Sequence, residues 1–219
     1  MAQYTGILCH VTSLPNGLKD AEKFIDYICD YGASLWQVLP ITPPDEHGSP
    51  YASPSAFAAW DSLGQSKSES MDADSYWLKD WLLFESLKLK FNGKPWCEWP
   101  KEYRDRDPGA LAEIETNEAA QARFMGRWKE IRNYAKSKNV NLIGDLPIFV
   151  DHDSADVWAH RDLFLLDEKG MPKVVAGVPP DYFSKKGQRW GTVLYNWDAH
   201  RKENWRWWKE RMARMMRLF

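Results

Sequence analysis

Asp145 is the residue whose type and position most strongly suggest chemistry. It interrupts an otherwise apolar run, NLIGDLPIFV, that extends from Asn141 to Val150. Apolar residues nearly fill this run without strict alternation, which is typical of a strand buried on both faces in a parallel sheet. Because Pro147 cannot donate a backbone hydrogen bond, we expect the carboxylate to emerge near the C-terminal end of the strand. Functional sites of parallel α/β folds are built at that end.

Two ordinary roles compete with a functional role for this carboxylate. An isolated aspartate commonly caps a turn, and it can also pair with a buried arginine. Arg189 is a candidate partner for either Asp145 or Asp181, and the sequence does not choose between them.

The segment 176–197, AGVPPDYFSKKGQRWGTVLYNW, is the second candidate feature because it is rich in glycine, proline and aromatic residues. Tyr182, Phe183 and Trp190 offer flat stacking surfaces, and Gln188 offers a hydrogen-bonding amide. A site for a sugar needs this mixture of apolar surface and polar fixing groups. We therefore predict a long loop that forms a cleft for a sugar or another planar ligand beside the acidic strand end.

Thirteen tryptophans are an unusually large number for 219 residues. Those at helical spacing among other apolar residues are expected in the core: Trp77, Trp81, Trp128, Trp205 and Trp208. Others lie among glycine, proline and aspartate, where stacking on a sugar and anchoring of a loop are equally plausible: Trp60, Trp96, Trp99, Trp190 and Trp197.

The composition excludes several classes of protein. With 44% hydrophobic and 27% charged residues the chain is globular, and its net charge of −2 offers no attraction for nucleic acid or an anionic membrane. No apolar run is long enough to span a bilayer, and no signal peptide is evident, so we predict a cytoplasmic protein.

Cys9, Cys29 and Cys97 are too widely and irregularly spaced for a disulfide framework or a zinc site. No histidine pair has metal-ligand spacing, and we predict neither a metal nor a cofactor.

The N-terminal part has the pattern strand, helix, strand. A β-rich run covers 4–14, a helix with one buried face covers 18–31, and a second apolar strand covers 35–41. One helix between two strands makes a βαβ unit, so we predict a parallel sheet with a right-handed crossover.

A mainly helical stretch should follow a polar linker over 58–74. The expected helices are one capped by Asp74 or Ser75 that runs through Phe91, one with Asp107 as N-cap and Pro108 as its first residue, and one containing Phe124, Trp128, Ile131 and Ala135. After the run at 141–150 we expect a short helix from Asp153 or Ser154, a hairpin over 163–175 turning at 168–170, and an amphipathic helix from Asp198 to Phe219.

Several motifs occur in a family-specific order: GILCHVTSLP, LWQVLPITPP, GSPYASPSAFA, NLIGDLPIFV, DSADVWAH and VVAGVPPDYFSKKGQRWGTVLYNWDAH. In these motifs the chain resembles the amylomaltases, the 4-α-glucanotransferase or disproportionating-enzyme family of the α-amylase clan. The resemblance covers most of the chain from Tyr4 to Phe219. Family members have longer segments after TSLP and after the SPY motif, so this chain resembles a relative with internal deletions.

The resemblance implies an α/β fold, namely the first strands of a (β/α)₈ TIM barrel with a helical insertion between the second and third barrel strands. We expect three parts: 1–57 holds the first βα units, 58–139 the linker and helical insertion, and 140–219 the third barrel strand, the substrate loop and the following helix.

The resemblance also implies the reaction, which is retaining transfer of α-1,4-glucan segments between maltooligosaccharides. The nucleophilic aspartate, the acid/base glutamate and a stabilising aspartate of the family are expected beyond Phe219, so no catalytic residue is predicted within the chain. Retaining transfer needs two carboxyls about 5 Å apart, and no spacing here supplies a substitute. We therefore expect the chain alone to be inactive.

The substrate-binding residues implied by the resemblance are Tyr51, Asp145, Tyr182, Phe183, Gln188 and Trp190. Gly187 and Gly191 are the expected hinges of a flexible loop over the glucan. The family's usual Asn-Pro is replaced by Thr192 and Val193, which leaves the exit of this loop undetermined.

Three functional alternatives stay open at this point. The chain is an N-terminal fragment or compacted relative of a glucanotransferase, a non-catalytic glucan-binding module, or one half of a two-chain enzyme or a gene product without function. An unpaired sheet edge at the Asn141 strand would favour self-association or a complementing C-terminal half.

Overall fold

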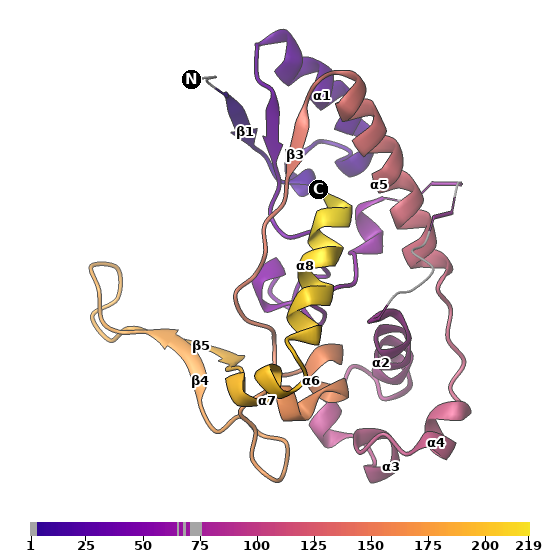
Figure 1. Cartoon of the computed structure of the whole chain (residues 1–219), viewed down its shortest axis with the longest axis vertical. Coiled ribbons are helices and arrows are strands. Elements are labelled where there is room, and N and C mark those ends of the chain that lie inside the picture. Colours follow the sequence, from indigo (N-terminus) through magenta and orange to yellow (C-terminus); the bar gives the residue numbers. More distant parts are fainter. Residues whose placement is uncertain (1–3, 65, 68, 71–75) are drawn as a thin grey trace.

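The computed structural model describes all residues except 1–3, 65, 68 and 71–75 (Figure 1). Its upper part contains a three-stranded parallel sheet in the order β1-β2-β3. The strands are β1 (Gly6–Leu8), β2 (Leu35–Gln37) and β3 (Asn141–Ile143). The short 3-10 helix Gly17–Asp20 and helix α1 (Ala21–Asp30) connect β1 to β2. The predicted βαβ unit and parallel sheet are thus confirmed.

One face of this sheet is covered by α1 and by the long helix α5 (Ala119–Ser137). Trp36 on β2 is fully buried there, and its indole Nε1 donates to the Cys9 carbonyl at 2.7 Å. The predicted stripe of α5 is also buried: Phe124, Trp128, Ile131 and Ala135. These residues form the upper of two hydrophobic clusters.

The segment between β2 and β3 is helical. It contains α2 (Leu78–Lys90), α3 (Lys101–Arg104), α4 (Pro108–Ala112) and α5. As predicted, Asp107 caps α4, where its carboxylate accepts from the Ala110 amide at 3.0 Å. The predicted caps of α2, Asp74 and Ser75, lie outside the described residues.

The lower cluster joins α2 to the C-terminal part of the chain. It includes α6 (Ala155–Ala159), which begins after the N-cap Ser154 as predicted, and the helices α7 (Trp197–Lys202) and α8 (Arg206–Leu218). Trp96 and Trp99 are buried in this cluster, so both anchor loops and neither is available to a sugar. Trp190 and Trp197 are about half exposed.

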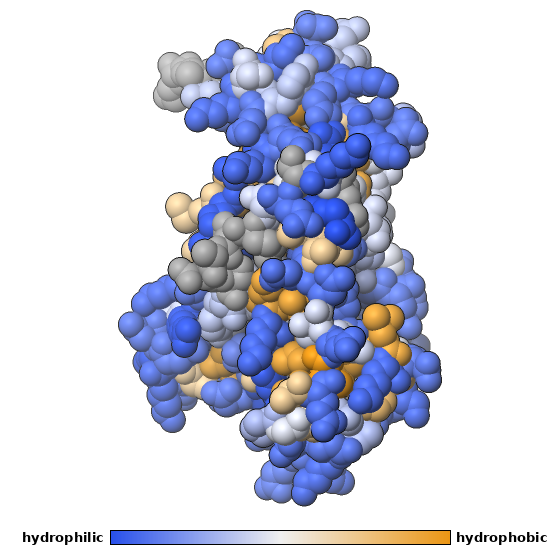
Figure 2. Space-filling model, turned by 90° about the vertical axis from the view of Figure 1, so that its right-hand side faces the viewer, coloured by the Kyte–Doolittle hydropathy of each residue, from blue (hydrophilic) through white to orange (hydrophobic). Residues whose placement is uncertain are grey.

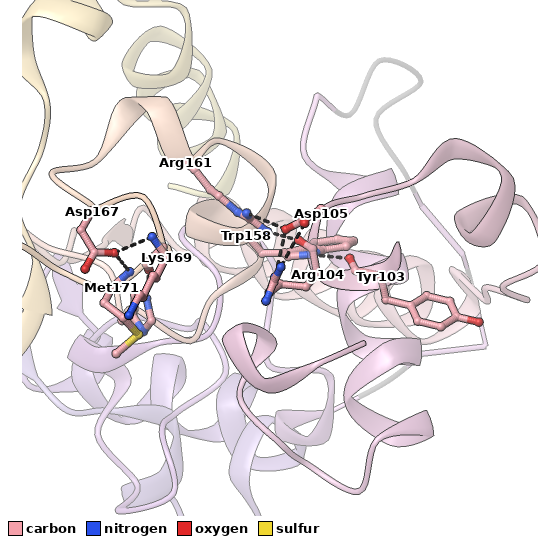
Figure 3. A network of polar contacts seen from close by, with 10 residues as sticks. Tyr103, Arg104, Asp105, Trp158, Arg161, Asp167, Lys169 and Met171 are labelled. Atoms are coloured by element: carbon pink, nitrogen blue, oxygen red, sulfur yellow. Dashed lines mark hydrogen bonds and ion pairs between the residues drawn. The ribbon is translucent and has the colours of Figure 1, made fainter. Parts of the chain in front are cut away.

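A polar network fixes α3 against the segment after α6 (Figure 3). Arg161 donates to the Arg104 carbonyl and pairs with Asp105 at 3.2 Å, and the Trp158 indole donates to the Tyr103 carbonyl at 3.1 Å. The hydrogen bond from Arg104 and that from Arg161 hold the pKa of Asp105 down at about 2. These contacts tie the helical segment to the lower cluster.

Three expected elements differ in the structure. The strand predicted over 141–150 is only Asn141–Ile143. It is not buried on both faces: Leu142 packs against the upper cluster, whereas Asn141 and Ile143 are exposed on the sheet face away from α1 and α5. The strand predicted over 35–41 ends at Gln37. The predicted last helix is two helices, since Asn204 and Trp205 adopt positive φ angles of 57° and 60° between α7 and α8.

The predicted long loop of segment 176–197 is a β-hairpin. Strands β4 (Val175–Val178) and β5 (Gln188–Val193) pair in antiparallel fashion and project from the body of the molecule (Figure 1). The hairpin predicted over 163–175 is confirmed by a bridge between Leu166 and Pro172 and by a turn in which Gly170 has a φ of 80°.

The sheet has two open edges, whereas one was expected. Among the described residues β1 and β3 each pair only with β2. The side of the molecule that lies at the right of Figure 1, where α5 and α2 are found, is mainly hydrophilic, with hydrophobic side chains gathered in its lower half (Figure 2). In the part of the chain that the structure covers, every helix is too short or too polar to cross a bilayer.

Candidate functional site

A cavity of about 540 Å³ lies where three distant segments of the chain meet. The first is the loop around Tyr51, the second is the irregular segment 145–149 that follows β3, and the third is β5. The lining residues are Asp45, Ser49, Tyr51, Ala52, Asp145, Leu146, Pro147, Ile148, Phe149, Trp190 and Thr192. Three of the six predicted binding residues, Tyr51, Asp145 and Trp190, therefore line one cavity.

Tyr51 and Asp145 form a direct hydrogen bond across the cavity. The Tyr51 hydroxyl donates to Asp145 Oδ2 at 2.6 Å, although the two residues are 94 positions apart in the sequence. This bond, with a smaller contribution from burial, raises the pKa of Tyr51 to about 12. Arg189, considered as a partner of Asp145 or Asp181, forms no ion pair with either among the described residues.

The loop that carries Tyr51 is held by Asp45. Its Oδ1 accepts from the amides of His47 at 2.9 Å and Ser49 at 2.7 Å, and its own amide donates to the Ser49 carbonyl at 3.0 Å. Asp45 and Ser49 line the cavity although neither was predicted as a binding residue. An Asp followed by Gly, Ser and Pro within five positions is a turn signal that could have indicated this loop geometry.

Strand β5 supplies the third wall. Trp190 is 50% exposed, and its indole Nε1 donates to Gln188 Oε1 at 3.1 Å. Thr192 is 6% exposed, and its hydroxyl has no hydrogen-bond partner in the described part of the chain.

The two remaining predicted aromatics lie outside the cavity. Tyr182 and Phe183 are 96% and 88% exposed at the turn between β4 and β5, where they contact each other edge to face. Asp181 shapes this turn, since its carboxylate accepts from the amides of Phe183 and Ser184. Gln188 does not line the cavity, but it accepts the hydrogen bond from the Trp190 indole.

The site suits binding by stacking and hydrogen bonding. A half-exposed indole, a phenol and an aspartate converge with apolar residues of segment 145–149, which is a combination that fits a sugar ring with its apolar faces and its hydroxyl groups. Within the described residues, no group of three or more His, Cys, Asp or Glu side chains is placed to hold a metal ion.

Comparison with known proteins identifies the family of the chain. The profile of the 4-alpha-glucanotransferase family matches residues 9–64 and 59–219. The chain belongs to this family. The resemblance seen in the sequence motifs is thereby confirmed.

Two relatives and one solved structure define the similarity. The chain is 34% identical to the 4-alpha-glucanotransferase of Aquifex aeolicus, over 98% of this chain and 57% of that protein. It is also 34% identical to the chloroplastic/amyloplastic enzyme of Arabidopsis thaliana, over 98% of this chain and 49% of that protein. The amylomaltase from Streptococcus agalactiae in complex with acarbose covers the whole chain with a TM-score of 0.88 and 28% identity, and 58% of it is matched. The α/β fold of amylomaltases is thus confirmed.

The comparisons also bear on the length of the chain. It spans about half the length of the curated relatives that it matches. The alignment with the Aquifex protein runs over 277 positions although the chain has 219 residues, so that relative has internal residues that this chain lacks. The two matched stretches of the family meet at 59–64, which is where the sequence predicts a deletion after the SPY motif.

Proposed function

We propose that the cavity binds an α-1,4-glucan and that the chain supplies the glucan-holding part of a 4-alpha-glucanotransferase. The observation that carries the proposal is the convergence of Tyr51, Asp145 and Trp190 on one cavity. Family membership supports the substrate class, because relatives matched over nearly all of this chain are named 4-alpha-glucanotransferases.

The full reaction would be retaining transfer between maltooligosaccharides, with catalytic acids from outside these 219 residues. Asp145 is bonded to Tyr51, and Asp45 accepts two backbone amides, so both carboxylates of the cavity act in positioning. We expect the isolated chain not to disproportionate maltotriose. Glucose release by the purified chain that is lost in Asp145→Asn would contradict this expectation.

The affinity of the isolated cavity should be weak. Stacking of one glucose ring on Trp190 contributes roughly 1 to 2 kcal/mol at about 25 cal/mol per Å² of buried apolar area. Association and the ordering of side chains oppose this gain. We expect a Kd near the millimolar range, which corresponds to about −4 kcal/mol.

Calorimetric titration with maltoheptaose tests the proposal. Trp190→Ala should weaken binding at least fivefold, since the indole is the largest flat surface in the cavity. Trp197→Ala is the matched control, because Trp197 is 51% exposed but lies outside the cavity. Equal losses in both variants, or none in either, would show that the glucan binds elsewhere or not at all.

We further propose that the sheet is the start of a (β/α)₈ barrel and that the helical segment before β3 is an insertion. The division into 1–57, 58–139 and 140–219 follows from that proposal. The open edges of β1 and β3 support self-association or pairing with a complementing half. A cytoplasmic location stays a prediction.

A non-catalytic glucan-binding module is the second candidate function. The cavity is formed by these residues alone, and its two carboxylates, Asp45 and Asp145, are both engaged in hydrogen bonds, which favours binding without catalysis. Co-expression with the C-terminal half of a related enzyme separates the candidates. Transfer activity in the mixture would support a split or partial enzyme, and glucan binding without activity would support the module.

A further inference from the structure

We propose that Arg211 is a positioning residue. From the interior of the protein it holds segment 145–149 in place, and this segment forms one wall of the glucan cavity. The inference rests in part on the proposed function, because the ligand of the cavity is the glucan proposed above. Its structural basis is the set of contacts that the Arg211 guanidinium makes in the interior.

Segment 145–149 lacks regular secondary structure, so its carbonyl groups need partners other than a neighbouring strand. Arg211 Nη2 donates to the Pro147 carbonyl at 2.7 Å. Arg211 Nη1 donates to the Tyr195 hydroxyl at 3.3 Å, and this hydroxyl in turn donates to the Ile148 carbonyl at 2.9 Å. Two successive carbonyls of the wall are therefore held by one guanidinium and one phenol.

The guanidinium is also fixed in place. Arg211 is 1% exposed and lies 5.1 Å and 5.3 Å from the ring centroids of Trp207 and Trp208. It forms no ion pair in the part of the chain that the structure describes, and burial lowers its pKa. A buried cation bonded to neutral acceptors is costly for folding compared with an apolar residue of similar size. This cost in folding free energy is explained if the N–H groups of the Arg211 guanidinium are needed to hold segment 145–149 in its conformation.

The buried side chains around Arg211, here called the buried layer, also contact the opposite wall: the layer consists of Arg211, Trp207 and Asp156. Asp156 accepts from the Trp207 indole at 3.0 Å and from the Ala56 amide at 2.8 Å, just after the Tyr51 loop. Trp207 thus lies between Arg211 and the support of the other wall. The layer therefore fixes the two sides of the Tyr51 and Asp145 hydrogen bond relative to each other.

Arg211→Lys tests the inference because it retains the charge but cannot span the Pro147 carbonyl and the Tyr195 hydroxyl in the same fixed geometry. Two readouts apply. We expect the pKa of Tyr51, isolated as the difference from a Tyr51→Phe background, to fall from about 12 toward its ordinary value of 10.0, because Asp145 moves with the wall. We also expect maltoheptaose binding to weaken at least fivefold.

Arg127→Lys is the control for general loss of stability. Arg127 also donates to a carbonyl, that of Leu18 at 2.6 Å, but it lies in the upper cluster and does not line the cavity. It should lower the melting temperature without changing either readout. Tyr195→Phe, which removes only the hydroxyl, should change both readouts in the same direction as Arg211→Lys and covers the case in which that variant does not fold.

Unchanged Tyr51 titration in both Arg211→Lys and Tyr195→Phe would overturn the inference. Changes that merely follow the loss of melting temperature in all variants, Arg127→Lys included, would also overturn it. If the parent chain fails to bind maltoheptaose, the proposed function fails, and the Tyr51 titration still decides the role of Arg211.

Discussion

The hydrogen bond between Tyr51 and Asp145 is the polar centre of the cavity. It joins the loop after β2 to the segment after β3, and at 2.6 Å it is a short hydrogen bond. A phenol that donates to a carboxylate occupies one carboxylate oxygen, so the other oxygen can still accept a further hydrogen bond.

The pKa of Tyr51 provides a prediction about pH. Its value in the folded chain, about 12, lies above its ordinary 10.0, so the native state retains the phenolic proton more strongly than the unfolded chain does. The stabilisation is fully present below pH 10 and is lost as the pH rises toward 12. Ultraviolet difference titration of the parent against Tyr51→Phe should show little phenolate from Tyr51 at pH 10.5.

Asp145→Asn supplies the control for this titration. The amide removes the negative charge, and Tyr51 should then ionise near its ordinary pKa of 10.0. Ionisation of Tyr51 near pH 10 in the parent itself would contradict the hydrogen bond.

At the scale of elements, the β4 and β5 hairpin determines where Trp190 lies. Gly187 and Gly191, predicted as hinges of a loop, adopt φ angles of 72° and 82° within this hairpin. A Cβ at Gly187 would lie 2.4 Å from the Val178 carbonyl oxygen, whereas a Cβ at Gly191 would meet no atom within 4 Å. The absence of a side chain at Gly187 therefore allows the backbones of β4 and the turn to approach each other closely.

Alanine substitution at the two glycines should separate steric from conformational effects. Each alanine should cost on the order of 1 kcal/mol for its positive φ, and Gly187→Ala should cost more because of the contact with Val178. Amide hydrogen exchange across β4 and β5 measures the cost locally. Equal protection factors in the two variants would refute the steric role.

Elements with local signals could be predicted from the sequence. Asp107 with Pro108, Ser154, and the buried stripe of α5 are set by capping and helical spacing, which depend on neighbouring residues only. The length of β3 could not be predicted, because it depends on pairing with β2, which lies far away in the sequence. The β4–β5 hairpin has a nearby partner, but the prolines and glycines of its connection are also typical of an irregular loop.

The candidate site was also predictable only in part. The family motifs implied Tyr51, Asp145 and Trp190 as binding residues, and the structure brings these three residues to one cavity. The placement of Tyr182 and Phe183 at an exposed turn was not evident, since an aromatic residue in a polar segment suits either a cleft or a turn. Arg211 carried no signal, because its spacing on an amphipathic helix resembles that of any surface arginine.

For the whole molecule, the open sheet edges predict association. Leu8 on β1 and Ile143 on β3 are 59% and 37% exposed, so apolar side chains accompany unpaired strand edges. We expect sedimentation velocity at micromolar concentration to show dimers or larger species. The double variant Leu8→Lys with Ile143→Lys should shift the population toward monomer.

Leu89→Lys is the matched control, because Leu89 is a 77% exposed apolar residue on α2, far from the sheet edges. This variant should associate as the parent does. A clean monomeric parent that unfolds cooperatively would disprove association through the edges.

The two walls of the cavity are far apart in the sequence, and this has a consequence for biosynthesis. Tyr51 leaves the ribosome 94 residues before Asp145. At about 5 to 20 residues per second, the loop after β2 therefore waits on the order of 5 to 20 seconds for its partner. During that interval the helices α2 to α5 are made while β2 has only β1 beside it. The nascent chain thus passes through a stage in which it exposes an unfinished sheet, and a chaperone that recognises strand edges would meet it then.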